Sequence, residues 1–183
     1  FWLKNQKSIN SLRDLKKNIL RKVPTIWRNY DSVICNPIIV QNPKKIKLIK
    51  RGWKNILRDP SILYDQKKQN IELQFDMHHG YNILHKSINC LPKKDRIKFN
   101  NFVKKEIKFN PNIMFISKKK ILEKWFKDLF KWLFKCEKVF GTKNLKGYDQ
   151  KRLYAYLAER YLSYWFKKNT KYLEWHWAFF EKK

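Results

Sequence analysis

Hydrophobic residues recur along most of the chain at the three- and four-residue spacing that is typical of amphipathic helices. Asn42 and Pro43 supply a cap and a first turn for one such stretch. The clearest stretch begins after Ser117, as its cap, and ends at Gly141. Together the patterns predict helices over residues 8–23, 43–58, 60–75, 77–91, 92–107, 118–140 and 148–168.

The pattern is less regular in two places. Val33–Cys35 and Ile38–Val40 are predicted to be short extended segments that Pro37 interrupts. Residues 170–183 form an aromatic tail, which contains Tyr172, Trp175, Trp177, Phe179 and Phe180. We therefore predict an all-α fold, an irregular bundle of six or seven amphipathic helices with a short extended segment near 33–40.

No internal repeat divides the chain, and its length fits one domain. We predict a single basic helical domain over residues 1–183, in which residues 1–40 can be read either as part of the bundle or as an extension. No apolar stretch is long enough for a transmembrane helix. The chain begins at Phe1 rather than Met, so the sequence leaves open whether a targeting peptide precedes it.

The charge balance narrows the function. The chain has 43 Lys and Arg against 15 Asp and Glu, a net charge of +28. Such a charge repels itself unless a polyanion neutralises it, which disfavours an ordinary metabolic enzyme. The 43% hydrophobic content disfavours simple disorder. Lysine far outnumbers arginine, and glycine and alanine are scarce, so part of the lysine excess reflects an AT-biased genome.

The placement of the charge indicates a binding surface. At roughly 100° per residue, the cations of each of two predicted helices fall in one stripe, away from the apolar residues of that helix. In the helix from Pro43, the apolar residues Ile46, Ile49, Trp53, Ile56 and Leu57 are expected to pack on the core and on neighbouring proteins. Stripes that largely lack acidic neighbours are typical of surfaces that track phosphates. The candidate RNA-binding residues are Lys44, Lys47, Arg51, Lys54, Arg58, Lys120, Lys124, Lys127, Lys131, Lys135 and Lys138.

Eight Trp, nine Tyr and thirteen Phe are more rings than a small core easily hides, and unpaired RNA bases stack on exposed rings. The aromatic tail is the candidate for such rings. The sequence contains no RNP1 motif, KH loop or zinc-finger spacing, so binding is expected to follow shape and backbone rather than base sequence.

Catalytic and metal-binding patterns are weak. His78, His79 and His85 lie near Cys90, but a zinc site needs a fourth suitable ligand that the sequence does not supply. Cys35, Cys90 and Cys136 are widely spaced and odd in number, which argues against a disulfide framework. We therefore predict no enzymatic activity, metal, cofactor or small-molecule substrate.

These features together predict a structural RNA-binding protein of the mitochondrial matrix, a lineage-specific component of a mitochondrial ribosome. Its expected partners are the rRNA phosphate backbone and neighbouring proteins of the ribonucleoprotein. One alternative is a soluble accessory subunit of an organellar membrane complex, the respiratory chain or ATP synthase, whose cations face anionic lipid. Another is a DNA-packaging protein.

Overall fold

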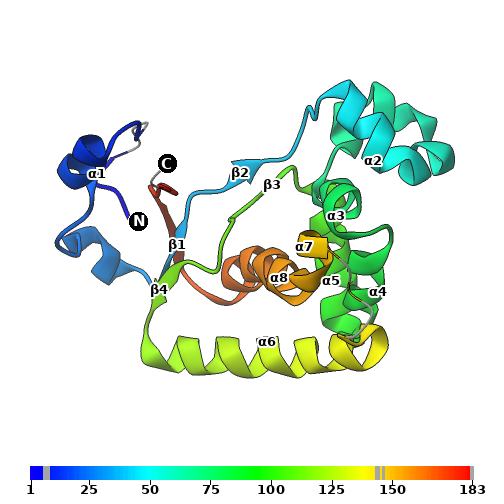
Figure 1. Ribbon diagram of the computed structural model, residues 1–183. Coiled ribbons are helices and arrows are strands. Elements are labelled where there is room, and N and C mark those ends of the chain that lie inside the picture. The colour runs from blue at the N-terminus through cyan, green and yellow to red at the C-terminus, as the bar shows by residue number, and fades with distance from the viewer. Residues whose placement is uncertain (6–8, 143–144, 146, 182–183) are drawn as a thin grey trace.

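The computed structural model describes residues 1–5, 9–142, 145 and 147–181. Figure 1 shows a mainly helical molecule in which α8 lies at the centre, α6 runs along one side and α2 lies at the opposite end. The helices are α1 Leu12–Asn18, α2 Lys45–Arg58, α3 Ile71–His79, α4 Ile83–Asn89, α5 Lys93–Lys105, α6 Lys119–Phe140, α7 Gly147–Lys151 and α8 Leu153–Asn169. Short 3₁₀ turns are η1 Thr25–Asn29, η2 Pro60–Leu63 and η3 Gln66–Lys68.

The all-α prediction is wrong, because the chain also forms two small sheets and is a mixed α/β protein with mostly helical content. One sheet has the order β4–β1–β5, in which β1 is antiparallel to β4 and parallel to β5. The other pairs β2 with β3. The strands are β1 Ser32–Cys35, β2 Ile38–Ile39, β3 Lys108–Phe109, β4 Phe115–Ser117 and β5 Tyr172–Trp175.

The aromatic tail supplies β5, which was not predicted, and neither were β3 and β4. Ser32 pairs with Tyr172 and Cys35 pairs with Trp175, so the tail completes the sheet around the buried strand β1. Each strand has four residues or fewer, too short for the alternation of apolar and polar positions that identifies strands in a sequence. The extended segments near 33–40 are confirmed as β1 and β2.

The core lies between α6 and α8 and extends to α3, α4 and α5. Trp125 and Trp132, seven residues apart on α6, both pack on Tyr161 of α8, with ring centroids 5.7 and 4.7 Å apart. The indole N–H of Trp132 donates to the Ser87 carbonyl at 2.7 Å, whereas the buried Trp125 nitrogen has no partner among the described residues. The inward face of α6 is therefore the one that its apolar pattern predicts.

A buried polar group links α8 to α3 within this core. Arg160 is fully buried and donates to Glu159 Oε2 at 2.9 Å and to Gln74 Oε1 at 2.7 Å. Its guanidinium also lies 3.9 Å from the ring centroid of Phe109. Burial raises the pKa of Glu159, an effect that Arg160 opposes. The buried guanidinium and the half-buried carboxylate therefore depend on each other for charge compensation.

Several helix boundaries differ from the prediction. The run over residues 77–91 breaks because Gly80 has φ +119° and Asn82 has φ +63°. Ile19 leaves the helical conformation and pairs with Leu3, so α1 is shorter than predicted, and Ser8 lies outside the described residues. The stretch over 60–75 forms η2, η3 and the start of α3, and 148–168 divides into α7 and α8.

Both expected caps of the cationic helices are also wrong. Lys44, not Asn42, precedes α2, and Lys118, not Ser117, precedes α6; neither side chain makes a capping hydrogen bond. Asn42 adopts φ +56° instead, and Ser117 belongs to β4. Gly141 ends α6 at φ +65°, as predicted.

Candidate functional site

The α6 lysine row consists of six exposed side chains along one side of the helix: Lys120, Lys124, Lys127, Lys131, Lys135 and Lys138. Lys124 is paired with Asp128 at 2.9 Å and also lies 5.0 Å from the Trp165 ring. The other five have no carboxylate within ion-pair distance among the described residues. The row therefore remains largely uncompensated, as the sequence predicted, with Lys124 as the exception.

Beside this row lies the phenylalanine ladder, made of Phe126, Phe130 and Phe134. These side chains are 39%, 47% and 60% exposed. Their rings are stacked along the helix, with centroids 5.8 and 6.0 Å apart and interplanar angles of 21° and 27°. The ladder occupies the flank of α6 between the buried tryptophans and the lysine row, so rings and ammonium groups are presented together.

The exposed rings were expected in the aromatic tail, and the ladder was not predicted. In the tail, the Trp175 indole donates to the Leu3 carbonyl and the Trp177 indole donates to the Asn36 carbonyl. Both rings are half-buried, and only Phe179 among the five is largely exposed. The signal for the ladder was the spacing of Phe126, Phe130 and Phe134, which are four residues apart. This spacing places them on a different side of the helix from Trp125 and Trp132.

The α2 cation stripe consists of Lys44, Lys47, Arg51, Lys54 and Arg58, all exposed. None of the five is paired with a carboxylate in the part of the chain that the structure describes. Lys54 lies 5.5 Å from the Trp53 ring and 5.8 Å from the Tyr81 ring. The stripe is thus available to a partner, although it lies at the other end of the molecule from α6 (Figure 1).

The part of the expectation that placed the apolar residues of α2 in the core is wrong. The α2 apolar face, made of Ile46, Ile49, Trp53 and Leu57, is 71%, 56%, 51% and 74% exposed. The helix instead packs on its neighbours through Leu48, Gly52 and Asn55. Ile56, the remaining apolar residue, is partly buried beside the small cluster that Leu48 forms with Ile62, Leu73 and Met77.

Gly52 and Asn55 lie on the side of α2 that faces α3, and Asn55 fixes this orientation. A Cβ on Gly52 would lie 3.2 Å from Leu48 Cδ1 within α2 and in ordinary van der Waals contact, at 3.4 Å, with Met77 Cγ of α3. The Asn55 amide donates to Asp76 Oδ2 at 2.8 Å in a buried position. A glycine and an asparagine carry no apolar signal, so the periodicity of the sequence pointed to the opposite face.

Asp76 makes the attachment of α2 sensitive to pH. Burial raises its pKa from 3.8 to about 6, against the effect of the Asn55 hydrogen bond. A raised carboxyl pKa favours the folded state while the group is protonated, so this contribution is lost as pH rises from about 4 through 6. The free energy of unfolding of the Asp76→Asn variant, relative to that of the native protein, should therefore rise by up to about 3 kcal/mol between pH 4 and 7. Urea unfolding of both proteins measures this difference.

The difference between the two proteins isolates Asp76, because His79, whose pKa burial lowers to about 3, is present in both. Glu123→Gln, which removes an exposed carboxylate from α6, is the matched control and should show no such pH-dependent gain. A stability difference between Asp76→Asn and the native protein that stays constant from pH 4 to 7 would contradict the assignment.

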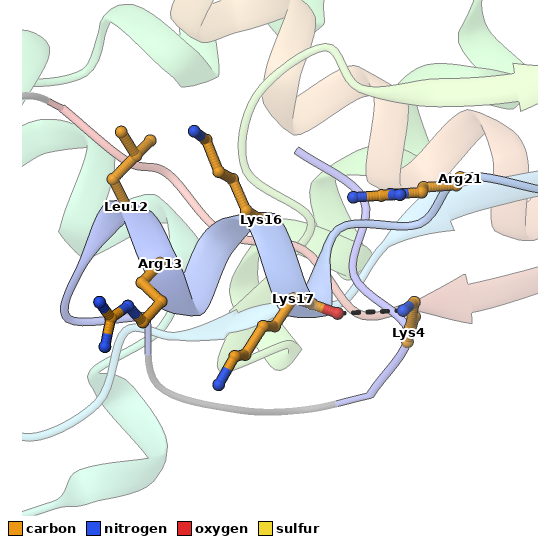
Figure 2. A pocket seen from close by; sticks show the side chains of 6 residues that line it. All are labelled: Lys4, Leu12, Arg13, Lys16, Lys17 and Arg21. Carbon is orange, nitrogen blue, oxygen red and sulfur yellow. Dashed lines mark hydrogen bonds between the residues drawn. The ribbon is translucent and has the colours of Figure 1, made fainter.

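A third cationic cluster surrounds α1, at a hollow of about 600 Å³. Figure 2 shows that Lys16 extends from one side of α1 while Arg13 and Lys17 extend from the other, so their charges do not converge on one point. Lys4 donates to the Lys17 carbonyl at 3.0 Å. This cluster adds positive charge to the surface without forming a defined site. The lining residues are Lys4, Leu12, Arg13, Lys16, Lys17 and Arg21.

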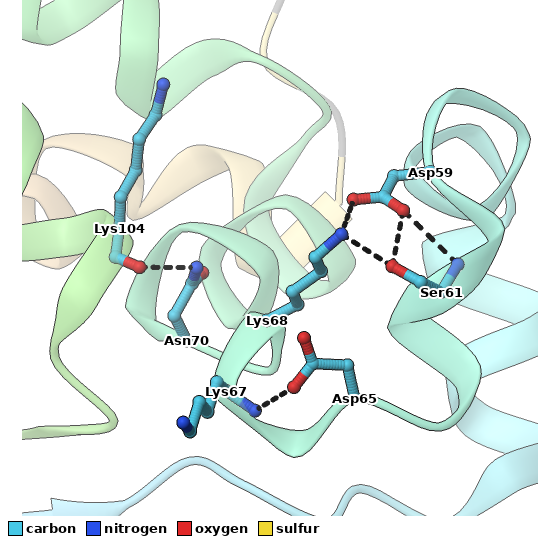
Figure 3. Close-up of polar contacts among 7 residues, drawn as sticks. All are labelled: Asp59, Ser61, Asp65, Lys67, Lys68, Asn70 and Lys104. Atoms are coloured by element: carbon cyan, nitrogen blue, oxygen red, sulfur yellow. Dashed lines mark hydrogen bonds and ion pairs between the residues drawn. The ribbon is translucent and has the colours of Figure 1, made fainter.

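The connection from α2 to α3 is different, because its charges are compensated locally. Lys68 forms an ion pair with Asp59 at 2.6 Å, and Asp59 also accepts from the backbone and hydroxyl of Ser61, as Figure 3 shows. Asn70 caps α3 and donates to the Lys104 carbonyl at 2.9 Å. Lysines near acidic residues therefore do pair in this fold, which distinguishes the unpaired cations of α2 and α6.

The first turn of α2 also borders a cavity of about 480 Å³ between β2 and α3. Lys44 and Lys47 lie at this cavity together with Gln74 and His78, and its other walls are mainly apolar. Burial lowers the pKa of His78, whose Nδ1 lies 2.9 Å from the Gln74 carbonyl. The half-buried histidine is thus held by α3 and favoured in its neutral form.

The candidate histidine and cysteine side chains are buried or half-buried in the fold. His79 stacks on Tyr156 at 3.8 Å between ring centroids, and burial raises the pKa of the Cys35 thiol to about 12. The Cys136 thiol is also buried, and burial raises its pKa. No group of three or more His, Cys, Asp or Glu side chains within the described ranges could hold a metal ion. Across the same ranges, no helix has both the length and the apolar character to cross a membrane.

Comparison with known proteins gives a family but no function. Residues 36–170 match the family model described as a domain of unknown function, DUF4422. The match covers well over half of the chain and includes α2, α6 and α8. No curated protein and no solved structure matches the chain. The chain therefore belongs to the DUF4422 family.

Proposed function

We propose that the protein is a non-catalytic RNA-binding protein and that α6 is its principal RNA-binding surface. The observation that carries the proposal is the position of the phenylalanine ladder directly beside the α6 lysine row. Rings alone are typical of many protein interfaces, and lysines alone are typical of solvated helices. A line of exposed rings beside a row of cations, of which all but Lys124 lack a carboxylate partner among the described residues, matches the two chemical faces of a single-stranded nucleic acid.

In this arrangement the lysines bind phosphate oxygens and release the counterions that are condensed on the RNA. Unpaired bases stack on Phe126, Phe130 and Phe134, and each stacked base contributes about 1–3 kcal/mol. Neither contact reads the hydrogen-bonding edge of a base. The expected binding is therefore salt-dependent and tolerant of sequence, with a preference for unpaired over fully paired RNA.

The wider setting follows from charge and size. The net charge of +28 on 183 residues is far larger than the charge of α6 alone, so cations elsewhere on the surface also need a polyanion to neutralise them. This supports a place inside a large ribonucleoprotein. A mitochondrial ribosome in the matrix remains our proposal for that assembly. It is tested by sedimentation of the endogenous protein with ribosomal subunits and by its release with RNase; sedimentation apart from RNA would contradict it.

The binding surface is tested by replacing Lys127, Lys131 and Lys135 with Gln, which removes three unpaired charges and leaves the Lys124–Asp128 pair intact. If each contacts one phosphate, the slope of log affinity against log salt should fall in magnitude by about 2 for single-stranded RNA. The measurement is fluorescence anisotropy with an unstructured RNA of about 20 nucleotides, between 50 and 200 mM salt.

The matched control replaces Lys93, Lys94 and Lys98 of α5 with Gln, which makes the same charge change on another exposed helix. Equal slopes for the two triple variants would contradict a specific role for α6.

The rings are tested by Phe130→Leu, which keeps an apolar side chain but removes the ring and should weaken binding by about fivefold or more. Phe179→Leu, at another exposed ring, is its control. A duplex DNA of the same length that binds more tightly than the RNA would favour the DNA-packaging alternative.

A further inference from the structure

The α2 apolar face is exposed to solvent, and α2 packs on the fold through a less apolar side. A helix normally buries its most apolar side, because each apolar side chain removed from water stabilises the fold. Here the buried side contains Gly52 and Asn55, and the exposed side contains Ile49, Trp53 and Leu57. The attachment is specific, since Asn55 is hydrogen-bonded to the buried Asp76. The orientation is thus fixed by the fold, and the apolar face is left for something outside it.

The charges around this face indicate what that partner is. At roughly 100° per residue, Lys45 and Lys50 lie on the two borders of the apolar face, and Lys54 and Lys47 lie just beyond Lys50. All four are exposed. From Ile46 to Leu57 the face extends over about 16 Å of helix. An apolar strip bordered by lysines on both sides, with a tryptophan within it, is typical of helices that lie in the surface of a membrane.

We propose that α2 docks on a membrane surface rich in anionic lipid, with its axis parallel to the bilayer. Ile46, Ile49, Trp53 and Leu57 would enter the boundary between head groups and acyl chains. Lys45, Lys50 and Lys54 would extend along the helix to reach lipid phosphates and carboxylates. The partner is an anionic bilayer rather than a neutral one, because no acidic residue lies within α2 to oppose the attraction.

This surface is separate from the proposed RNA-binding surface. α2 contacts η2 and α3, whereas α6 contacts α8, and Figure 1 shows the two helices at opposite ends of the molecule. One end could therefore contact lipid while α6 remains open to RNA. The membrane proposal does not rest on the RNA proposal, and each is tested with variants of its own helix.

The experiment is flotation of the RNase-treated full chain with vesicles of phosphatidylcholine alone and of phosphatidylcholine with phosphatidylserine. The native protein should float with the anionic vesicles and not with the neutral ones. Replacing Ile49, Trp53 and Leu57 together with Ser should lower the partition coefficient for anionic vesicles by about 100-fold, because three exposed apolar side chains lose their lipid environment. Their exposure means that the fold should persist, which circular dichroism checks.

Two further proteins make the result decisive. A triple variant at other exposed apolar positions, Val23→Ser, Ile97→Ser and Val139→Ser, should float like the native protein. So should the variant with Gln at Lys127, Lys131 and Lys135, which tests the RNA surface instead. If the serine variant of α2 floats as well as the native protein, the cations alone cause adsorption and the proposal is wrong. Failure of the native protein to float with anionic vesicles would also overturn it and would leave the face to a protein partner.

Discussion

Replacing Arg160 with Met should lower the free energy of unfolding by about 3–5 kcal/mol at neutral pH. Arg160 is the fully buried cation that pairs with Glu159 and hydrogen-bonds to Gln74. Methionine would fill much of its volume but would leave the Glu159 carboxylate buried without its partner charge. Urea unfolding followed by circular dichroism measures the loss.

The same substitution makes a prediction about pH. Arg160 opposes the rise in the pKa of Glu159 that burial causes, so removing it should raise that pKa further. The carboxyl group would then become neutral at mildly acidic pH in the folded variant, and its cost of burial would disappear. The stability deficit of Arg160→Met should therefore shrink as pH falls from 7 towards 4.

A double variant separates the charge effect from simple loss of packing. Arg160→Met with Glu159→Gln leaves no unpaired charge and should recover a large part of the loss. Arg160→Lys keeps the charge but lacks the planar fork that bonds to both Glu159 and Gln74, so it should give an intermediate loss. A double variant that is as unstable as Arg160→Met would show that packing on Phe109, and not charge, accounts for the effect.

The second large effect is expected at the core of α6. Replacing either Trp125 or Trp132 with Ala should cost about 3–5 kcal/mol, because each is buried against Tyr161 and would leave a cavity. Thermal or urea unfolding of each single variant measures the cost. A loss below about 1 kcal/mol at either position would contradict the packing of α6 on α8.

The two tryptophans also form a matched pair, because only Trp132 has a partner for its indole N–H. Replacement of Trp132 with Phe removes the hydrogen bond to Ser87, whereas replacement of Trp125 with Phe removes a buried polar group that has no partner. Trp132→Phe should therefore be the more destabilising by about 1 kcal/mol or more. Equal costs would mean that the Ser87 hydrogen bond adds nothing to stability.

The helices that the sequence predicted best are those whose apolar face coincides with the core. On α6 the tryptophans face inward and the lysines face outward, so local periodicity was sufficient. On α2 the periodicity located both the cations and the apolar residues correctly on the helix, but it did not indicate the side that packs on α3. That side contains Gly52 and Asn55, of which Asn55 bonds to a buried carboxylate, and neither contributes to an apolar pattern.

The sheets were beyond local reasoning for a different reason. β1 pairs with residues 115–117 and 172–175, so its partners are distant in the sequence and no spacing rule connects them. The tail appeared to be a set of rings without a place in the core, because Tyr172–Trp175 acquires its extended conformation from β1. The phenylalanine ladder could have been predicted, since Phe126, Phe130 and Phe134 repeat every four residues. The exposure of these rings could not have been predicted from that spacing.

The pairing of β1 also has a consequence for how the protein is made. β1 is fully buried in the finished fold, yet both of its neighbours in the sheet are synthesised much later. At about 5–20 residues per second, the ribosome needs on the order of ten seconds or more after β1 before β5 emerges. Until β4 emerges, Val33, Ile34 and Cys35 lack both strands that pair with β1, and until β5 emerges they still lack one, which makes this segment a natural target for a chaperone on the nascent chain.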